Sequence, residues 1–156
     1  MTPIRRLDHV AIVVGDTDAA LEHFERRLGL QVVHSEELAA PHVRLTYLDA
    51  GNAYVQLVEP LDPDGDLGRW LADNGEGLHH ICFGAEDPLA AAASVAVDGA
   101  PPPVQGSGRG RISSFVPGAP PHGVRIEYTE FRADEDVGES VRSETAPGPA
   151  ASRRTR

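Results

Sequence analysis

Lysine is absent from this chain of 156 residues, and all 14 basic residues are arginines. A lysine Schiff base with a carbonyl substrate therefore cannot form, which excludes that class of covalent catalysis. Cys82 is the single cysteine, so no disulfide can form within the chain. A single thiol fits a reducing compartment, and we expect a cytoplasmic protein.

Long apolar runs and basic stripes are also missing. No run of apolar residues approaches the length of about 20 that a membrane span requires. Arg5, Arg6 and Asp8 interrupt the N-terminal segment, unlike the apolar core of a signal peptide. The formal net charge of -10 repels phosphate backbones. We therefore expect neither a membrane nor a nucleic acid as a partner.

The first part of the chain predicts a strand, a helix and three further strands. Segment 7–14 is apolar and β-branched, which is typical of a buried strand. Segment 15–30 has Asp16 or Thr17 as a helix N-cap, an apolar face, and Gly29 after its last turn. The three further strands are predicted at 30–37, 42–51 and 53–60.

The same order of elements then recurs. Segment 78–85 predicts a strand, and 86–100 predicts a helix with Asp87 as N-cap and Pro88 at its first position. The following strands are predicted as a short one around Val104 and longer ones at 111–117 and 123–131.

These patterns predict an α+β fold of two βαβββ modules that form one cleft. The predicted divisions are 1–62 for the first module, 63–77 for a linker with a short helix, 78–131 for the second module and 132–156 for a disordered tail. Disorder of the tail is predicted from its polar, proline-containing composition, because the segment has too few apolar residues to join a core.

The repeat aligns four residues that can each offer a donor atom to a metal ion. Alignment of DHVAI with HHICF places His9 on His80, and alignment of the last strand of each module places Gln56 on Glu127. Both pairs are separated by 71 residues, and each histidine precedes its partner in the last strand by 47. A pseudo-twofold axis would bring the four side chains together inside a concave sheet.

Two imidazoles, one amide and one carboxylate suit a divalent metal ion such as Co, Ni, Mn, Zn or Fe. Octahedral positions would stay open for water or substrate, as in catalytic metal sites. His79 is the competitor of His80, but only His80 shares the register of His9. Strand alternation predicts that His79 points to the opposite face.

At these residues the sequence resembles the vicinal oxygen chelate superfamily, also called the glyoxalase fold, and within it the methylmalonyl-CoA epimerases. The strongest stretches are LDHVAIVV, QLVEPLDPDGDLGRWLADNGEGLHHICF and GVRIEY. The resemblance implies that His9, Gln56, His80 and Glu127 are the metal ligands and that the substrate is a small molecule of the acyl-CoA class. We also expect a homodimer.

Two departures from the family pattern concern the substrate side. A HisProLys turn is common in the family, whereas Val116, Pro117 and Gly118 stand at that place. Some members carry an acidic residue, proposed as a second base, at the position of Leu45.

The expected activity is that of an isomerase: epimerisation by removal of the proton α to a thioester carbonyl, with Glu127 as ligand and proton carrier. Glu37 and His42 are the candidates for a second acid or base. Other chelate chemistry stays open, either a glyoxalase-type isomerase or lyase or an extradiol dioxygenase. A metal-free resistance protein that sequesters a ligand between aromatic rings is a further alternative, although aromatic residues make up only 5% of the chain.

Overall fold

An eight-stranded mixed sheet forms the framework of the computed structural model, which describes residues 3–135. The strands are β1 (Arg6–Val13), β2 (Gln31–Leu38), β3 (Val43–Asp49), β4 (Tyr54–Pro60), β5 (Gly77–Ala85), β6 (Gly106–Gly108), β7 (Arg111–Phe115) and β8 (Ile126–Glu130). The helices are α1 (Thr17–Leu21), the π-helical η1 (Glu22–Arg27), α2 (Asp66–Asn74), α3 (Pro88–Val95) and the 3-10 turn η2 (Pro121–Gly123).

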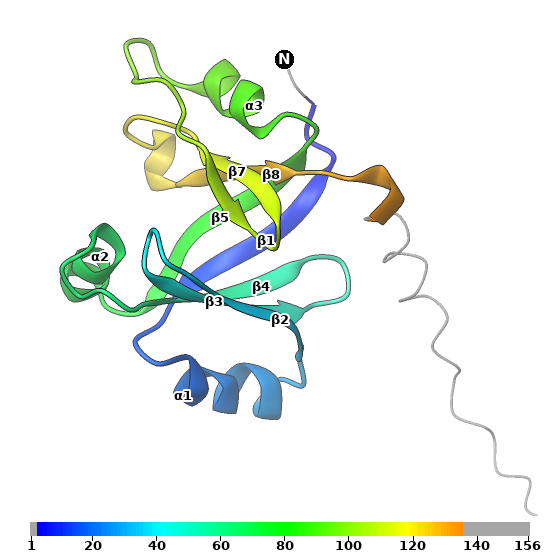
Figure 1. The fold of residues 1–156 in the computed structure, drawn as a ribbon, viewed down its shortest axis with the longest axis vertical. Helices are drawn as coiled ribbons and strands as arrows, with labels where there is room; N and C mark the ends of the chain where they lie inside the picture. Colours follow the sequence, from blue (N-terminus) through cyan, green and yellow to red (C-terminus); the bar gives the residue numbers. More distant parts are fainter. Residues whose placement is uncertain (1–2, 136–156) are drawn as a thin grey trace, which may run out of the picture.

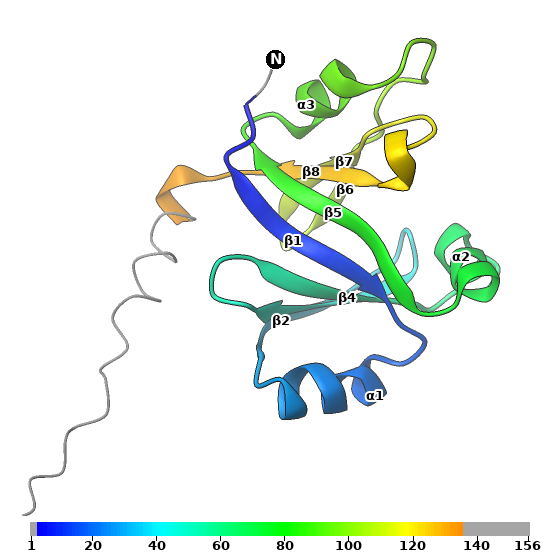
Figure 2. The same cartoon turned by 180° about the vertical axis from the view of Figure 1, so that it is seen from behind.

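Two βαβββ modules share this sheet, whose strand order is β2-β3-β4-β1-β5-β8-β7-β6. In the first module β1 pairs in parallel with β4, and in the second β5 pairs in parallel with β8. The antiparallel strands β1 and β5 join the modules and run side by side through the centre of the molecule (Figure 1, Figure 2). The predicted α+β fold of two βαβββ modules is confirmed.

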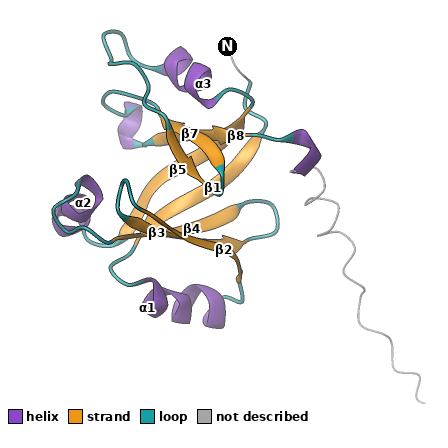
Figure 3. Ribbon diagram, viewed as in Figure 1, coloured by secondary structure: helices purple, strands orange, loops and turns teal. Residues whose placement is uncertain are grey.

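Alternation along the strands separates an inner face of the sheet from an outer face. In β1, Ala11 and Val13 belong to an inner apolar cluster that includes Tyr47. Ile12, between them, packs instead with the cluster around Leu48, which Phe24 of η1 covers. The helices α1, η1 and α3 therefore lie on the outer faces of the two modules, and Figure 3 shows them there in purple.

The predicted N-caps of both outer helices are confirmed. Asp16 accepts a hydrogen bond from the backbone nitrogen of Ala19, and Asp87 accepts one from that of Ala90. Gly29 follows the first helix with a φ of 79°, a conformation that glycine adopts without strain. The second half of this helix, η1, is π-helical, which the apolar periodicity did not predict.

The second outer helix is shorter than predicted. It ends at Val95 rather than near Ala100, because Ala96 is extended, with φ -65° and ψ 147°. Val95 and Val97 are β-branched and Gly99 has a φ of 79°, so this segment has a low helix propensity.

The short strand predicted around Val104 is also misplaced. The structure has β6 at Gly106–Gly108 instead. Three consecutive prolines at 101–103 lack the backbone N–H groups that a strand ladder needs, so pairing begins only after them. The carbonyl of Val104 still accepts a hydrogen bond, of 3.0 Å, from the Ser114 hydroxyl.

Within residues 3–135, no helix is both long and apolar enough to span a membrane. The predicted tail overlaps the described part of the chain only at residues 132–135. There Arg132 donates to the carbonyl of Gly110 at 3.1 Å, and Glu135 pairs with Arg111 at 3.0 Å. The rest of the predicted tail lies outside the described residues.

Candidate metal centre

The two modules present their candidate ligands in the same register. In the parallel pair β1 and β4, Ala11 lies opposite Gln56, and in the pair β5 and β8, Cys82 lies opposite Glu127. His9 is therefore two residues before Ala11, and His80 is two residues before Cys82, so both histidines have the same position relative to the last strand of their module. The exposed fractions are 3% for His9, 4% for Gln56, 6% for His80 and 9% for Glu127.

Three of the four side chains converge on one point. Oε2 of Glu127 lies 3.1 Å from Nε2 of His80 and 3.4 Å from Nε2 of His9. One potential ligand atom from each of these residues lies within 4.8 Å of the other two. The strands that carry them come from both modules, so this cluster exists only in the folded chain.

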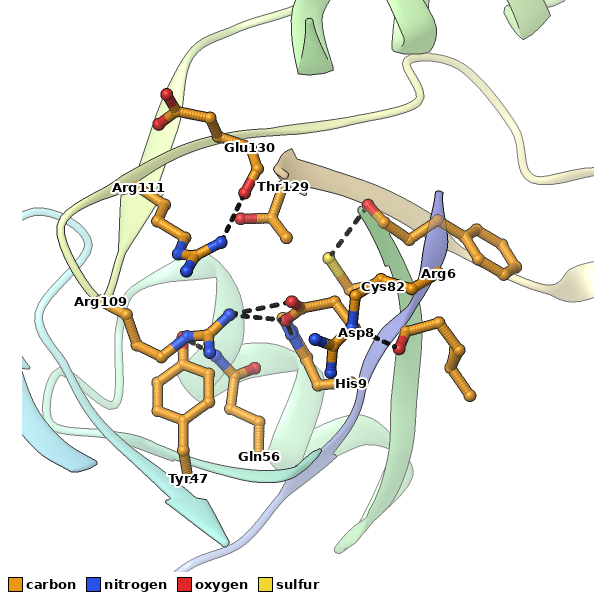
Figure 4. Close-up of polar contacts among 12 residues, drawn as sticks. Arg6, Asp8, His9, Tyr47, Gln56, Cys82, Arg109, Arg111, Thr129 and Glu130 are labelled. Atoms are coloured by element: carbon orange, nitrogen blue, oxygen red, sulfur yellow. Dashed lines mark hydrogen bonds and ion pairs between the residues drawn. The ribbon is translucent and has the colours of Figure 1, made fainter. Parts of the chain in front are cut away.

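Gln56 is oriented by a neighbouring tyrosine. Its amide nitrogen donates a hydrogen bond of 2.7 Å to the Tyr47 hydroxyl, as Figure 4 shows. The Tyr47 ring also packs against the His9 ring, with centroids 5.7 Å apart and planes at 87°. The amide oxygen of Gln56 is thereby left for another partner close to His9.

Unpartnered buried atoms test whether these residues fit a cation. Nε2 of His9, Nε2 of His80 and Oε1 of Gln56 are buried and have no hydrogen-bond partner among the described residues. Buried polar atoms nearly always have partners, so three such atoms on the candidate ligands require an explanation. Each can offer a lone pair, and the set of two imidazoles, an amide and a carboxylate suits a borderline divalent ion.

The protonation states of the cluster also favour a divalent cation. Burial would raise the pKa of Glu127, but the imidazoles of His80 and His9 close to its carboxylate hold it well below its ordinary value. Burial lowers the pKa of His80, which Glu127 offsets only in part. An ionised carboxylate and a neutral imidazole are the protonation states that metal binding requires.

His9 differs from His80 in this respect. Burial alone would lower the pKa of His9, but the hydrogen bond with Asp8 and the nearby carboxylate of Glu127 outweigh burial and raise it. The surroundings of this ring therefore favour a positive charge, which a divalent cation would also supply.

A β-bulge corrects the predicted direction of His79. In β5, His80 and Leu78 face consecutive residues of β1, so His79 is the extra residue of a bulge. Its Nδ1 lies 2.7 Å from Nδ1 of His80, and the two rings are 5.1 Å apart. The prediction that His79 points to the opposite face is wrong, because a bulge breaks the alternation on which it rested.

The first module has a matching bulge. Leu7 and His9 face consecutive residues of β5, so Asp8 is the extra residue. Its carboxylate oxygen Oδ1 lies 2.7 Å from Nδ1 of His9. In both modules, then, the residue before the candidate histidine contacts Nδ1 and leaves Nε2 towards the cluster.

Cys82 adjoins the site. Its sulfur forms a second compact group with Asp8 and His9. Burial raises the pKa of the thiol well above its ordinary value, so it is protonated when no metal is bound.

Glu37, His42 and Leu45, the positions considered for a second acid or base, do not place an acid or base at this cluster. Leu45 is 7% exposed and belongs to the inner apolar cluster. Nε2 of His42 lies 3.1 Å from Oε1 of Glu37, and both side chains are exposed. His42 lies away from the cluster, because it precedes Tyr47 by five residues, which is about 16 Å along an extended strand.

Three residues around the cluster were not singled out from the sequence: Asp8, Tyr47 and Arg109. The repeat alignment held a signal for Asp8, because a polar residue precedes the candidate histidine in both modules. Tyr47 lies opposite Gln56 on the neighbouring strand, a register that depends on the turn between them. Arg109 lies 101 residues from its partner Asp8, and no local pattern marks it.

Replacement of Tyr47 by phenylalanine is expected to weaken Co2+ binding about fivefold, because a hydrogen bond of about 1 kcal/mol that orients the Gln56 amide is lost. Titration of the metal-free protein with Co2+ measures this. Tyr128→Phe, on the outer face of β8, is the control and should bind as the wild type does. Equal affinity of both variants would show that Tyr47 does not orient Gln56.

Comparison with known families gives a match over most of the described chain. The sequence model of the Glyoxalase/Bleomycin resistance protein/Dioxygenase superfamily matches residues 8–115. This segment contains three of the four candidate ligands and excludes Glu127.

Two relatives share about a third of their aligned residues with this chain. The Bacillus subtilis protein YqjC, described as uncharacterized, is 36% identical over 80 residues, which is 51% of this chain and 57% of YqjC. The chain thus matches little more than half the length of YqjC. The Cereibacter sphaeroides ethylmalonyl-CoA/methylmalonyl-CoA epimerase is 34% identical over 112 residues, 71% of this chain and 82% of that enzyme.

A solved structure extends the similarity to the three-dimensional fold. A variant of Streptomyces coelicolor methylmalonyl-CoA epimerase, in complex with 2-nitronate-propionyl-CoA, has a TM-score of 0.73 and 34% sequence identity to this chain. The match covers 84% of this chain and 97% of that one.

Proposed function

Because the chain belongs to the Glyoxalase/Bleomycin resistance protein/Dioxygenase superfamily, we propose that it is a metal-dependent epimerase that moves the proton α to an acyl thioester carbonyl. The observation that carries the proposal is the compact group of His9, His80 and Glu127, together with the unpartnered buried atoms of His9, His80 and Gln56. The similarity to methylmalonyl-CoA epimerases supports methylmalonyl-CoA or a close analogue as the substrate.

His9, Gln56, His80 and Glu127 would hold the cation. When bound, a divalent cation supplies Lewis acidity that stabilises the negative charge developing on a substrate carbonyl oxygen. Co, Ni, Mn, Zn and Fe all suit this set of donor atoms.

Glu127 is the residue that we propose as the proton carrier. Its pKa lies well below the ordinary value despite burial, so the carboxylate is ionised at neutral pH. Both short contacts with the imidazoles involve Oε2. Oε1 is therefore the oxygen that we assign to proton transfer.

The walls of the site would shield this transfer from bulk water. The Phe115 ring packs edge-on against His80, with centroids 4.8 Å apart. Leu45 and Tyr47 are buried on the side of the first module. A site with few water molecules strengthens the electrostatic interactions of Glu127 and the two histidines.

In heavy water, the Co2+-loaded protein is expected to incorporate deuterium at the α carbon of methylmalonyl-CoA. Proton removal is the step that the carboxylate and the cation assist, whichever group later returns a proton. Mass spectrometry of the recovered thioester measures the exchange. A chelator should stop the exchange, and added Co2+ or Ni2+ should restore it.

A chain that binds Co2+ stoichiometrically but exchanges no acyl thioester would contradict the epimerase while leaving the metal site intact. Isomerisation or oxidation of substrates with two neighbouring oxygens would then be the chemistry to test next.

A further inference from the structure

A buried carboxylate outside the four candidate ligands contacts one of them directly. Asp8 is 1% exposed, and its Oδ1 lies 2.7 Å from Nδ1 of His9. A carboxylate can only accept, so Nδ1 of His9 must carry the proton of this hydrogen bond. That tautomer leaves the lone pair on Nε2, the atom facing Glu127.

An arginine from the other module holds this carboxylate. Nη2 of Arg109 lies 2.8 Å from Oδ1 and 3.0 Å from Oδ2 of Asp8, as Figure 4 shows. The guanidinium also lies over the rings of Tyr47 and Tyr54, at 4.8 Å and 4.7 Å from their centroids. These contacts leave Arg109 little freedom to rotate away from Asp8.

The backbone around Arg109 is anchored on the first module as well. Arg109 has a φ of 53°, a conformation that residues other than glycine rarely adopt. Its backbone N–H donates to Oε1 of Glu36 in β2, at 2.6 Å. A Cβ atom on the preceding Gly108 would lie 2.7 Å from the Tyr47 hydroxyl, so any other residue there would displace this hydroxyl. The turn between β6 and β7 is thus seated on the first module.

We infer that Asp8 is a positioning residue for His9, and that Arg109 holds Asp8 in place from the second module. The contact between Asp8 and His9 fixes the ring orientation and tautomer of a candidate ligand, as carboxylates beside metal-binding histidines commonly do. The hairpin of β6 and β7 therefore helps to build a site to which it contributes no ligand. This inference rests on the proposed metal site and is independent of the proposed reaction.

The contact at His80 provides an internal comparison. His79 takes the place of Asp8 there, with its Nδ1 2.7 Å from Nδ1 of His80. Only the partner of His9 carries a negative charge, which strengthens the hydrogen bond and attracts a cation. Loss of Asp8 should therefore cost more affinity than loss of His79.

Asp8→Asn tests the inference because asparagine keeps the size and one oxygen acceptor of aspartate but removes the charge. The affinity for Co2+ is expected to fall by about 10- to 100-fold. The visible spectrum of bound Co2+ should also shift, since the orientation of one imidazole changes. Asp8→Glu should recover part of the affinity. Asp18→Asn, which breaks a surface ion pair with Arg44, is the matched control and should leave both readouts unchanged.

A second variant separates positioning from a folding defect. Asp8→Asn alone leaves Arg109 with no counterion for its buried charge, which can destabilise the fold. Asp8→Asn combined with Arg109→Gln removes both charges, and it is expected to melt closer to the wild type while still binding Co2+ weakly. Recovery of full Co2+ affinity in this double variant would overturn the inference.

The remaining outcomes distinguish the inference from the proposal on which it rests. Wild-type affinity and spectrum in Asp8→Asn would overturn the positioning role while the metal site stands. Absence of Co2+ binding by the wild-type chain would overturn the metal site and this inference with it.

Discussion

Replacement of His80 by alanine is expected to abolish measurable Co2+ binding, and α-proton exchange with it. His80 contributes one of the three unpartnered buried atoms of the candidate ligands, and its Nε2 lies 3.1 Å from Oε2 of Glu127. Loss of a ligand should exceed the roughly 100-fold loss of affinity that removal of a ligand's hydrogen-bond partner can cause. Elemental analysis of the purified variant and Co2+ titration measure the effect.

The control for this experiment is His23→Ala, which removes an exposed imidazole on η1 that packs against Phe24. It should keep the metal content of the wild type. Circular dichroism should show the same secondary structure in both variants. Stoichiometric Co2+ in a folded His80→Ala protein would exclude this residue as a ligand and favour another donor set.

Glu127→Gln is expected to reduce deuterium exchange at the α carbon by at least about 100-fold, because a positioned acid or base contributes about 100- to 10,000-fold. Glutamine retains an oxygen that can bind a cation but cannot carry the proton at neutral pH. The variant should therefore still bind Co2+, with lower affinity because the negative charge is lost. Single-turnover exchange with the variant saturated in Co2+ separates the two effects.

Glu130→Gln is the matched control, because Glu130 belongs to the same strand and its carboxylate pairs with Arg132 rather than with the candidate site. Its exchange rate should equal that of the wild type. If Co2+-saturated Glu127→Gln exchanged as fast as the wild type, Glu127 would be a ligand only, and the proton carrier would be another residue.

The two variants together locate the function within the site. His80→Ala should lose the metal and the exchange, whereas Glu127→Gln should lose the exchange and retain the metal. Loss of metal from both variants would show that Glu127 is an essential ligand. Its role in proton transfer would then be tested with an ion that binds more tightly.

Much of the fold followed from local patterns. The N-caps Asp16 and Asp87 and the alternation of apolar residues along the strands act over a few residues, so the printed sequence contains them in full. The misplaced strand near Val104 and the early end of α3 are local as well, but prolines and β-branched residues outweighed the patterns used there.

The convergence of the candidate ligands was predictable because the chain repeats. His9 and His80, like Gln56 and Glu127, are separated by 71 residues, so each pair has the same position in its module. This correspondence can be found from the sequence without information on long-range contacts. The roles of these residues as metal ligands stay predictions until a metal is measured.

Only the tertiary structure decided what surrounds these residues. The bulges that turn Asp8 and His79 towards their neighbouring histidines arise from pairing between β1 and β5, which alternation within one strand cannot reveal. The contact of Arg109 with Asp8 joins residues 101 positions apart. Such contacts depend on how two modules pack, because a side chain far along the chain is brought near only after both have folded. The sequence thus determined which groups could meet a metal, and packing between the modules determined which groups surround them.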